Sequence, residues 1–168
     1  RQIGYVLQQI ALFPHMTIEE NVSVVPHLLK WDKKKVEERV HNLFQLTGLN
    51  ENLRKKYPGE LSGGQQQRVG VMRALAAEQD VILMDEPFSA LDPISRDQLQ
   101  NDLLRLNAEL GKTILFVTHD MNEALKLGSR ICLMNDGEIV LIGTKEEILA
   151  SKDEFVQEFM GQVRGTVQ

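Results

Sequence analysis

The sequence predicts an α/β fold in which a mostly parallel sheet carries an inserted α-helical subdomain. From about residue 80 onward, short apolar runs with strand character alternate with helical patterns, the order expected of a parallel sheet. The preceding stretch is almost entirely helical in pattern. We therefore expect four parts: a core strand in 1–8, the helical subdomain in 9–79, the α/β core in 80–150 and a C-terminal helical extension in 151–168.

The N-terminal elements have clear local signals. Residues 3–7 form a short apolar run that predicts a buried strand. Thr17 and Glu20 have the spacing of a capping box, so a helix is expected to begin there. Apolar residues recur at helical spacing over 32–46, and Gly48 is expected to end that helix.

The remaining elements follow in a regular order. Ser62 is expected to cap a helix that runs from Gly63 to about Glu78. The runs 81–85 and 114–118 are continuously apolar, which is typical of strands buried on both faces. The other predicted elements are helices 93–110 and 121–127, strands 130–135 and 138–142 joined at Asp136-Gly137, and two short helices within 144–160.

Composition excludes several classes of protein. The chain has 168 residues, of which 42% are hydrophobic and 26% charged, so it has the length and composition of one globular domain. The formal charge is −5, and the dense basic run Lys33-Lys34-Lys35 is followed by Glu37 and Glu38. We expect the pairs Lys33/Glu37 and Lys34/Glu38 on a solvated helix face. Nucleic acid is not an expected partner.

The single cysteine and the hydropathy bear on the cellular compartment. Cys132 lies in an apolar run and is expected to be a buried core residue in a reducing compartment, the cytoplasm. No apolar stretch approaches the roughly 20 residues needed to cross a bilayer. Work at a membrane would therefore require a partner.

Two adjacent carboxylates end an apolar strand at Asp85-Glu86. Ligands of open α/β sheets bind beyond the carboxyl ends of the strands. One carboxylate at such a place can hold Mg²⁺, and its neighbour can orient or deprotonate a water molecule. The competing interpretation is a solvated strand end that happens to carry two acids.

A serine and two glycines open the helix predicted after residue 62. Ser62, Gly63 and Gly64 leave backbone N–H groups bare at the positive end of a helix, which suits a phosphate. An ordinary helix cap explains the same residues. Thr118-His119 follows the predicted strand 114–118. Its imidazole can bond a phosphate oxygen, and the competing interpretation is a surface histidine at a strand end.

In combination and in this order, the motifs closely resemble the ATP-binding cassette (ABC) family, over nearly the whole chain. The motifs are Leu61-Ser62-Gly63-Gly64-Gln65-Gln66-Gln67-Arg68, Asp85-Glu86-Pro87 after an apolar run, Ser89-Ala90-Leu91-Asp92, and Thr118-His119. The first is that family's specific signature. The resemblance implies a partial P-loop NTPase core of RecA-like fold, with ATP and Mg²⁺ as cofactors and a head-to-tail dimer with a second copy of the subunit.

The resemblance also implies roles in binding the nucleotide across the dimer. Ser62, Gly63, Gly64 and Gln65 would bind the γ-phosphate of ATP held by the opposite subunit, and Asp92 would close the D-loop across the dimer.

The catalytic roles follow in the same way. Asp85 would be the Walker-B magnesium residue and Glu86 the general base. His119 would be the switch histidine. Gln8 would be the Q-loop glutamine, which touches Mg²⁺ or the lytic water; the plainer interpretation of Gln8 is a polar residue after a strand.

One family motif is missing from these residues. The P-loop pattern Gly-x-x-x-x-Gly-Lys-[Ser/Thr] has no match, because Leu106 stands where Gly111-Lys112-Thr113 would require a glycine. That triplet also precedes a strand, so we expect a helix end and a turn. The chain opens at Arg1 within strand-like sequence, and we expect an N-terminally truncated piece that lacks the phosphate cradle.

Within the family, the sequence resembles importer ATPases for glycine betaine, carnitine or choline, a subgroup that often continues into regulatory CBS domains. The stretches that carry this are Gln8–Ile18, Leu28-Leu29-Lys30-Trp31, Asp85–Ile94 and Asp153–Phe159. The expected location is the cytoplasmic face of the membrane. Transmembrane permease subunits are expected to dock near residues 9–16, whose apolar side chains pack into the helical subdomain in the competing interpretation.

Three alternatives stay open at this point. The importer could carry a sugar, an amino acid or a polyamine instead. A soluble, non-transport ABC ATPase would need coiled-coil insertions or basic faces, which the sequence lacks. The third alternative is a non-enzymatic piece: without a phosphate cradle, the isolated 168 residues are expected to have negligible ATPase activity and to self-associate through an exposed sheet edge.

Overall fold

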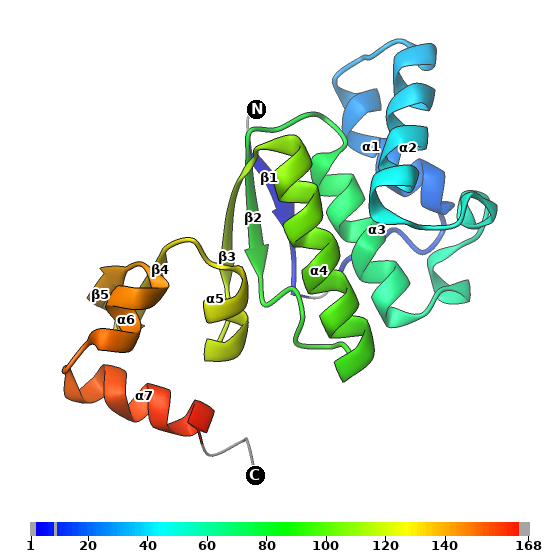
Figure 1. The fold of residues 1–168 in the computed structure, drawn as a ribbon. Helices are drawn as coiled ribbons and strands as arrows, with labels where there is room; N and C mark the ends of the chain where they lie inside the picture. The colour runs from blue at the N-terminus through cyan, green and yellow to red at the C-terminus, as the bar shows by residue number, and fades with distance from the viewer. Residues whose placement is uncertain (1–2, 9, 165–168) are drawn as a thin grey trace. The chain divides into compact units, whose positions relative to one another are not determined.

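The computed structural model describes residues 3–8 and 10–164 and confirms the α/β class. The chain forms two compact units, Arg1–Val117 and Thr118–Gln168 (Figure 1). The four-part division expected from the sequence stays a prediction. The parts of those expectations that concern residues 1, 2, 9 and 165–168 lie outside the described residues.

The first unit is built on a parallel sheet. The strand order is β1-β2-β3, and every pairing is parallel. Val6 lies opposite Met84, and Asp85 lies opposite Val117, so the segments that follow the three strands leave the sheet at one edge. The strands are β1 (Ile3–Val6), β2 (Val81–Asp85) and β3 (Thr113–Val117).

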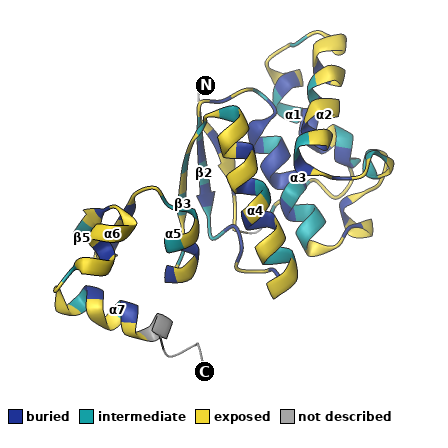
Figure 2. Cartoon of the chain, in the orientation of Figure 1, coloured by how far each residue is buried: buried dark blue, intermediate teal, exposed yellow. Residues whose placement is uncertain are grey.

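Helix α3 (Gly63–Leu75) is the central element of this unit. It contacts three other helices and strand β1, and its buried residues are seen in dark blue in Figure 2. A side chain on Gly4 of β1 would collide with the carbonyl of Ala74, so glycine permits this close packing. The other helices are α1 (Ile18–Leu28), α2 (Lys33–Thr47), α4 (Pro93–Leu110) and the short 3₁₀ turns η1 (Glu51–Leu53) and η2 (Pro58–Glu60).

The end of α3 differs from the prediction. The helix ends at Leu75, three residues before the expected Glu78. The guanidinium of Arg39 on α2 donates to the carbonyl oxygens of Leu75 at 2.7 Å and Ala76 at 3.3 Å. These bonds satisfy carbonyls that the helix leaves without an internal partner, so the helix can stop there.

The prediction that both apolar strands are buried on both faces was wrong. The strand expected at 114–118 is β3, and its Leu115 and Val117 are 61% and 59% exposed. Only the opposite face of the sheet is covered, where Ile82 and Met84 of β2 are buried. An apolar run shows that its side chains avoid water, but it does not show how many faces of the strand are covered. Here one face of the sheet has no neighbour among the described residues of this unit.

The second unit packs an antiparallel hairpin and three helices around a small core. The core residues are Met121, Ile131, Leu133, Ile148, Val156 and Met160. Asp136 and Gly137 both have positive φ, as a tight hairpin turn requires, which confirms the predicted turn. The elements are α5 (Met121–Leu127), β4 (Ile131–Asn135), β5 (Glu138–Gly143), α6 (Lys145–Ala150) and α7 (Glu154–Arg164).

The expectation of a buried cysteine was also wrong, because Cys132 is exposed. Side chains alternate along β4, so Ile131 and Leu133 enter the core while Cys132 lies on the other face. The apolar run around Cys132 therefore does not mean that both faces of β4 are buried.

Local helix signals were more reliable. Thr17 and Glu20 form the predicted capping box, and Gly48 ends α2 in the left-handed conformation. Lys34 lies 3.9 Å from Glu38 on an exposed face, as expected, while the pair Lys33/Glu37 stays a prediction. No helix within 3–8 and 10–164 is both long and apolar enough to cross a membrane.

A buried asparagine holds the loop that precedes α1. Asn21 is fully buried, and its side-chain amide donates to the carbonyls of Phe13, Met16 and Thr17 at 3.0–3.1 Å. Its side-chain oxygen accepts the backbone N–H of Phe13 at 2.8 Å. One side chain therefore replaces the secondary-structure bonds that residues 13–17 lack.

Replacing Asn21 with alanine is expected to destabilise the protein by about 3 kcal/mol, because buried backbone groups lose their partner. Urea unfolding of the full-length protein measures this change. The exposed Asn42 of α2 supplies the control, since Asn42→Ala should change the free energy of unfolding by less than about 0.5 kcal/mol. Equal effects of the two substitutions would contradict the assignment.

Candidate functional site

The ends of β1 and β2 bring two predicted catalytic residues together. The side-chain amide of Gln8, two residues beyond β1, donates to the carboxylate of Glu86 at 2.9 Å. Glu86 directly follows β2. These residues are 78 positions apart in the sequence, and parallel pairing of the strands places them at the same edge of the sheet.

The backbone of Glu86 is held in an uncommon conformation. Its φ angle is 42°, in the left-handed region that non-glycine residues seldom adopt. Its N–H donates to the carbonyl of Val117 at 3.0 Å, and its carbonyl accepts from the backbone N–H and hydroxyl of Ser89 at 3.2 and 3.0 Å. Strain of this kind persists where surrounding bonds fix it, and here it sets the direction of a carboxylate.

Asp85 is the last residue of β2 and is partly buried. Asp85 and Gln8 follow or end neighbouring strands at the same end of the sheet, so their side-chain oxygens are the predicted ligands of Mg²⁺. Mg²⁺ normally takes one or two protein ligands and completes its shell with water and substrate phosphates, so this donor set fits that ion. A cage of three or more His, Cys, Asp or Glu side chains is not found within the described residues.

The start of α3 is a capping box, and the phosphate contact predicted for it stays a prediction. The Ser62 hydroxyl accepts the N–H of Gln65 at 3.3 Å, and the Gln65 side-chain oxygen accepts the N–H of Ser62 at 2.9 Å. Gly63 is exposed and has open space where a side chain would be. The cap leaves the Ser62 hydroxyl hydrogen and the Gln65 side-chain N–H₂ as the donors of these two side chains.

Asp92 begins α4 next to the start of α3. Its carboxylate accepts the N–H groups of Ile94 and Ser95, both at 3.1 Å. Hydrogen bonds from Ser95, first through its side chain and then its backbone, hold the pKa of Asp92 below its ordinary value. A side chain built on Gly64 would lie 3.1 Å from Cβ of Ser95, so the two helix starts are in contact.

The predicted switch histidine belongs to the second unit. Strand β3 ends at Val117, and the exposed His119 comes two residues later. The preceding Thr118 donates its hydroxyl to Glu123 at 2.6 Å and accepts the N–H of Asp120 at 3.0 Å. This turn fixes the backbone around His119, and the convergence of His119 with Glu86 stays a prediction.

The Gly-Lys-Thr triplet is a helix end, as predicted. Gly111 has a φ of 59° and terminates α4, and Thr113 begins β3. The Lys112 ammonium donates to the Glu78 carbonyl at 3.3 Å and to Asp80 at 3.4 Å. It serves to join the end of α4 to the start of β2.

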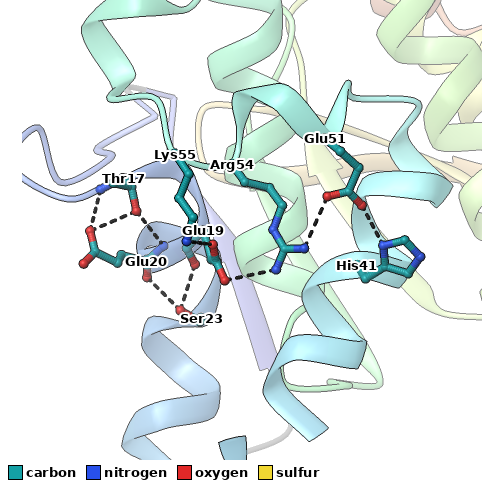
Figure 3. Close-up of polar contacts among 8 residues, drawn as sticks. All are labelled: Thr17, Glu19, Glu20, Ser23, His41, Glu51, Arg54 and Lys55. Atoms are coloured by element: carbon teal, nitrogen blue, oxygen red, sulfur yellow. Dashed lines mark hydrogen bonds and ion pairs between the residues drawn. The ribbon is translucent and has the colours of Figure 1, made fainter. Parts of the chain in front are cut away.

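A chain of polar contacts ties the first turn of α1, which follows the loop formed by residues 10–16, to the segment before α3. Figure 3 shows Glu19 between Lys55 at 2.8 Å and Arg54 at 3.0 Å, and Glu51 between Arg54 at 3.3 Å and His41 at 2.7 Å. Partial burial acts to raise the pKa of Glu19, but the bonds and charges of Lys55 and Arg54 hold that pKa below its ordinary value. The first turn of α1 is thus tied to the segment before α3.

The tip of this loop is presented outward. Phe13 is 41% exposed, and Pro14 and His15 are exposed as well. Ile10 instead packs toward Gly70 of α3. The packing of Ile10 agrees with the interpretation in which the loop packs into the helices, while Phe13 at the tip is exposed; docking of a partner on the loop stays a prediction.

Sequence reasoning missed Asn21 and Arg73, which shape this loop. Arg73 of α3 donates to the carbonyls of Ile10 and Ala11. A signal for Asn21 was available, because it shares one face of α1 with the buried Ile18 and Val22. A polar residue on an apolar helix face needs a bonding partner. Arg73 gave no comparable signal.

Known proteins share sequence and fold with this chain. Residues 1–89 match the family model described as ABC transporter. The carnitine transport ATP-binding protein OpuCA of Listeria monocytogenes is 60% identical over 165 residues, which are 98% of this chain and 42% of that protein. The glycine betaine/carnitine/choline transport ATP-binding protein OpuCA of Bacillus subtilis is 58% identical, covering 98% of this chain and 43% of that protein. The chain thus spans less than half the length of these relatives.

A solved structure agrees in fold. The dimeric post-hydrolysis state of the ATP-binding cassette MJ0796 bound to ADP and Pi has a TM-score of 0.72 and 38% sequence identity, covering 86% of this chain and 63% of that one. The family match over more than half of the residues, together with these relatives, shows that the chain belongs to the ABC transporter family.

Proposed function

We propose that the chain is part of the ATP-hydrolysing subunit of a bacterial importer for quaternary-amine osmoprotectants such as glycine betaine, carnitine or choline. The identity to relatives with those printed substrates supports the substrate class. A third relative, the osmoprotectant import ATP-binding protein OsmV of Salmonella typhimurium, is 52% identical, covering 98% of this chain and 44% of that protein.

The observation that carries the proposal is the bond between Gln8 and Glu86. It joins the predicted nucleotide sensor to the predicted general base at the carboxyl end of a parallel sheet. That edge is where open α/β sheets bind ligands. The strained backbone of Glu86 directs a carboxylate there, as a base for water requires.

The chemistry follows from these placements. Glu86 takes a proton from water as the water attacks the γ-phosphorus; the bond from that phosphorus to the β–γ bridging oxygen breaks, and ADP leaves with phosphate as the second product. Gln8 fixes the carboxylate through its amide. Asp85 and the Gln8 oxygen would hold Mg²⁺, which supplies charge neutralisation at the phosphates. His119 would donate a hydrogen bond to the γ-phosphate.

The signature residues act from a second copy in this proposal. The N–H groups of Gly63 and Gly64 at the helix start, with the Ser62 hydroxyl and the Gln65 amide, would bind the γ-phosphate held by the other subunit. Asp92 fixes the start of α4 beside them. The dimeric state printed for the solved neighbour supports a paired arrangement. Hydrolysis then lets the two subunits part.

The membrane partner is proposed to be a permease that docks on the loop tip around Phe13, which places the protein at the cytoplasmic face of the membrane. The exposed aromatic ring and neighbouring Pro14 offer an apolar contact for a partner helix. The loop is shaped before any partner arrives, because Asn21 and Arg73 already bond its backbone. A preformed loop lowers the cost of docking.

Replacing Glu86 with glutamine in the full-length protein is expected to lower ATP turnover by about 100-fold or more, because the amide cannot accept the proton. ATP-bound dimers should persist, and size-exclusion chromatography with ATP measures them. Glu37→Gln, an exposed carboxylate on α2, is the matched control and should leave turnover unchanged. Wild-type turnover in the Glu86 variant would remove Glu86 as the base.

Phe13→Glu should lower osmoprotectant uptake about tenfold relative to ATP hydrolysed, since a charge placed in an apolar contact costs binding energy. Uptake and hydrolysis are measured together in vesicles that contain the complete transporter. Leu104 on α4 is 42% exposed, close to the 41% of Phe13, so Leu104→Glu is the control. Unchanged coupling in the Phe13 variant would exclude the loop tip as the docking surface.

A further inference from the structure

The far end of the signature helix is bonded directly to the start of the loop of residues 10–16. Arg73, in the last turn of α3, donates from two guanidinium nitrogens to the carbonyl oxygens of Ile10 and Ala11, each at 2.9 Å. Its guanidinium carbon also lies 5.8 Å from the ring centroid of Phe13. One side chain thus contacts both the backbone and the exposed ring of the loop.

The bonded backbone is not in a conformation that it would hold unaided. Ala11 has a φ of 44°, which costs energy for a residue with a side chain. Arg73 bonds the carbonyl of Ala11 and that of the residue before it. The planar fork of an arginine can donate to two neighbouring oxygens at once, whereas a lysine ammonium lacks that fixed geometry.

The packing of helix α3 favours its behaviour as a rigid body. Its 13 residues span about 20 Å at 1.5 Å per residue. Its buried side chains contact α1, α2, α4 and β1, so bending within it is opposed on several sides. Ser62 caps one end, and Arg73 lies in the last turn at the other.

We propose that Arg73 is a positioning residue that carries displacement of the phosphate-facing end of α3 to the loop of residues 10–16 and so to the docked membrane partner. The inference rests on the proposed function, since it assigns a path between its two sites. Arg73 touches neither nucleotide nor partner backbone in this proposal; it acts by holding the loop to the helix.

The chain contains a matched arginine for the control. Arg39 also donates to two backbone carbonyls at the end of α3, those of Leu75 and Ala76, and contacts no residue of the loop in those bonds. Burial lowers the pKa of both arginines, so the two side chains are in comparable surroundings. A role confined to stabilising the fold would therefore give the two arginines similar phenotypes.

The test compares Arg73→Met, Arg73→Lys and Arg39→Met in the full-length protein. Hydrogen exchange of the Phe13 and Met16 amides reports the order of the loop, because the Phe13 amide donates to Asn21 of α1 and the Met16 amide donates to the carbonyl of Phe13. Vesicles containing the complete transporter report ATP hydrolysed per glycine betaine taken up. The methionine keeps the bulk of the side chain and removes its donors.

For Arg73→Met we expect loop exchange to rise about tenfold and ATP consumed per betaine to rise by a similar factor, the loss expected from charge-assisted bonds. Arg73→Lys should lie between the wild type and Arg73→Met, and it keeps the test decisive should Arg73→Met fail to fold. Arg39→Met should change neither quantity, even where it lowers the melting temperature.

Unchanged exchange and coupling in both Arg73 variants would overturn the inference, as would equal changes in Arg39→Met. Failure of the proposed function gives a different result. The wild-type transporter would then show no ATP-driven uptake of betaine, while the exchange comparison would still report whether Arg73 orders the loop.

Discussion

The burial of helix α3 is the constraint on which the rest of the first unit depends. Its apolar residues pack against three helices and against β1, where Gly4 permits contact with the helix backbone. Because bending of α3 would disturb these contacts, the position of Ser62 at its start is tied to the position of Arg73 near its end. Helix α3 therefore links the predicted phosphate contacts at its start to the loop of residues 10–16, which Arg73 bonds near its end.

Parallel strand pairing supplies the second half of the site. It brings Gln8 and Glu86 together from distant parts of the sequence, and the bonds from Val117 and Ser89 hold Glu86 in a strained conformation. A strained residue at the end of a strand is stable only where its neighbours fix it. The order of the sheet thus determines the direction of the carboxylate that the proposed hydrolysis needs.

Local chemistry made most elements predictable from sequence, because caps and turns depend on residues close along the chain. Thr17, Ser62 and Asp92 cap helices that begin where expected. Burial was less predictable, because it depends on which face of a sheet packs against a neighbouring element. Cys132 and Leu115 both lie on exposed faces. The hydrogen bonds from Arg73 to the loop were missed because their acceptors are backbone carbonyls about 60 positions away, which no local pattern encodes.

The central claim, that the start of α3 faces the γ-phosphate in a site shared by two copies, has a direct chemical test. Orthovanadate trapped with ADP occupies the γ-phosphate position, and ultraviolet light then drives oxidation and cleavage of the backbone at the residues nearest to it. Mass spectrometry of the full-length protein after trapping and illumination should find cleavage at Ser62. Cleavage at other positions with Ser62 intact would contradict the account.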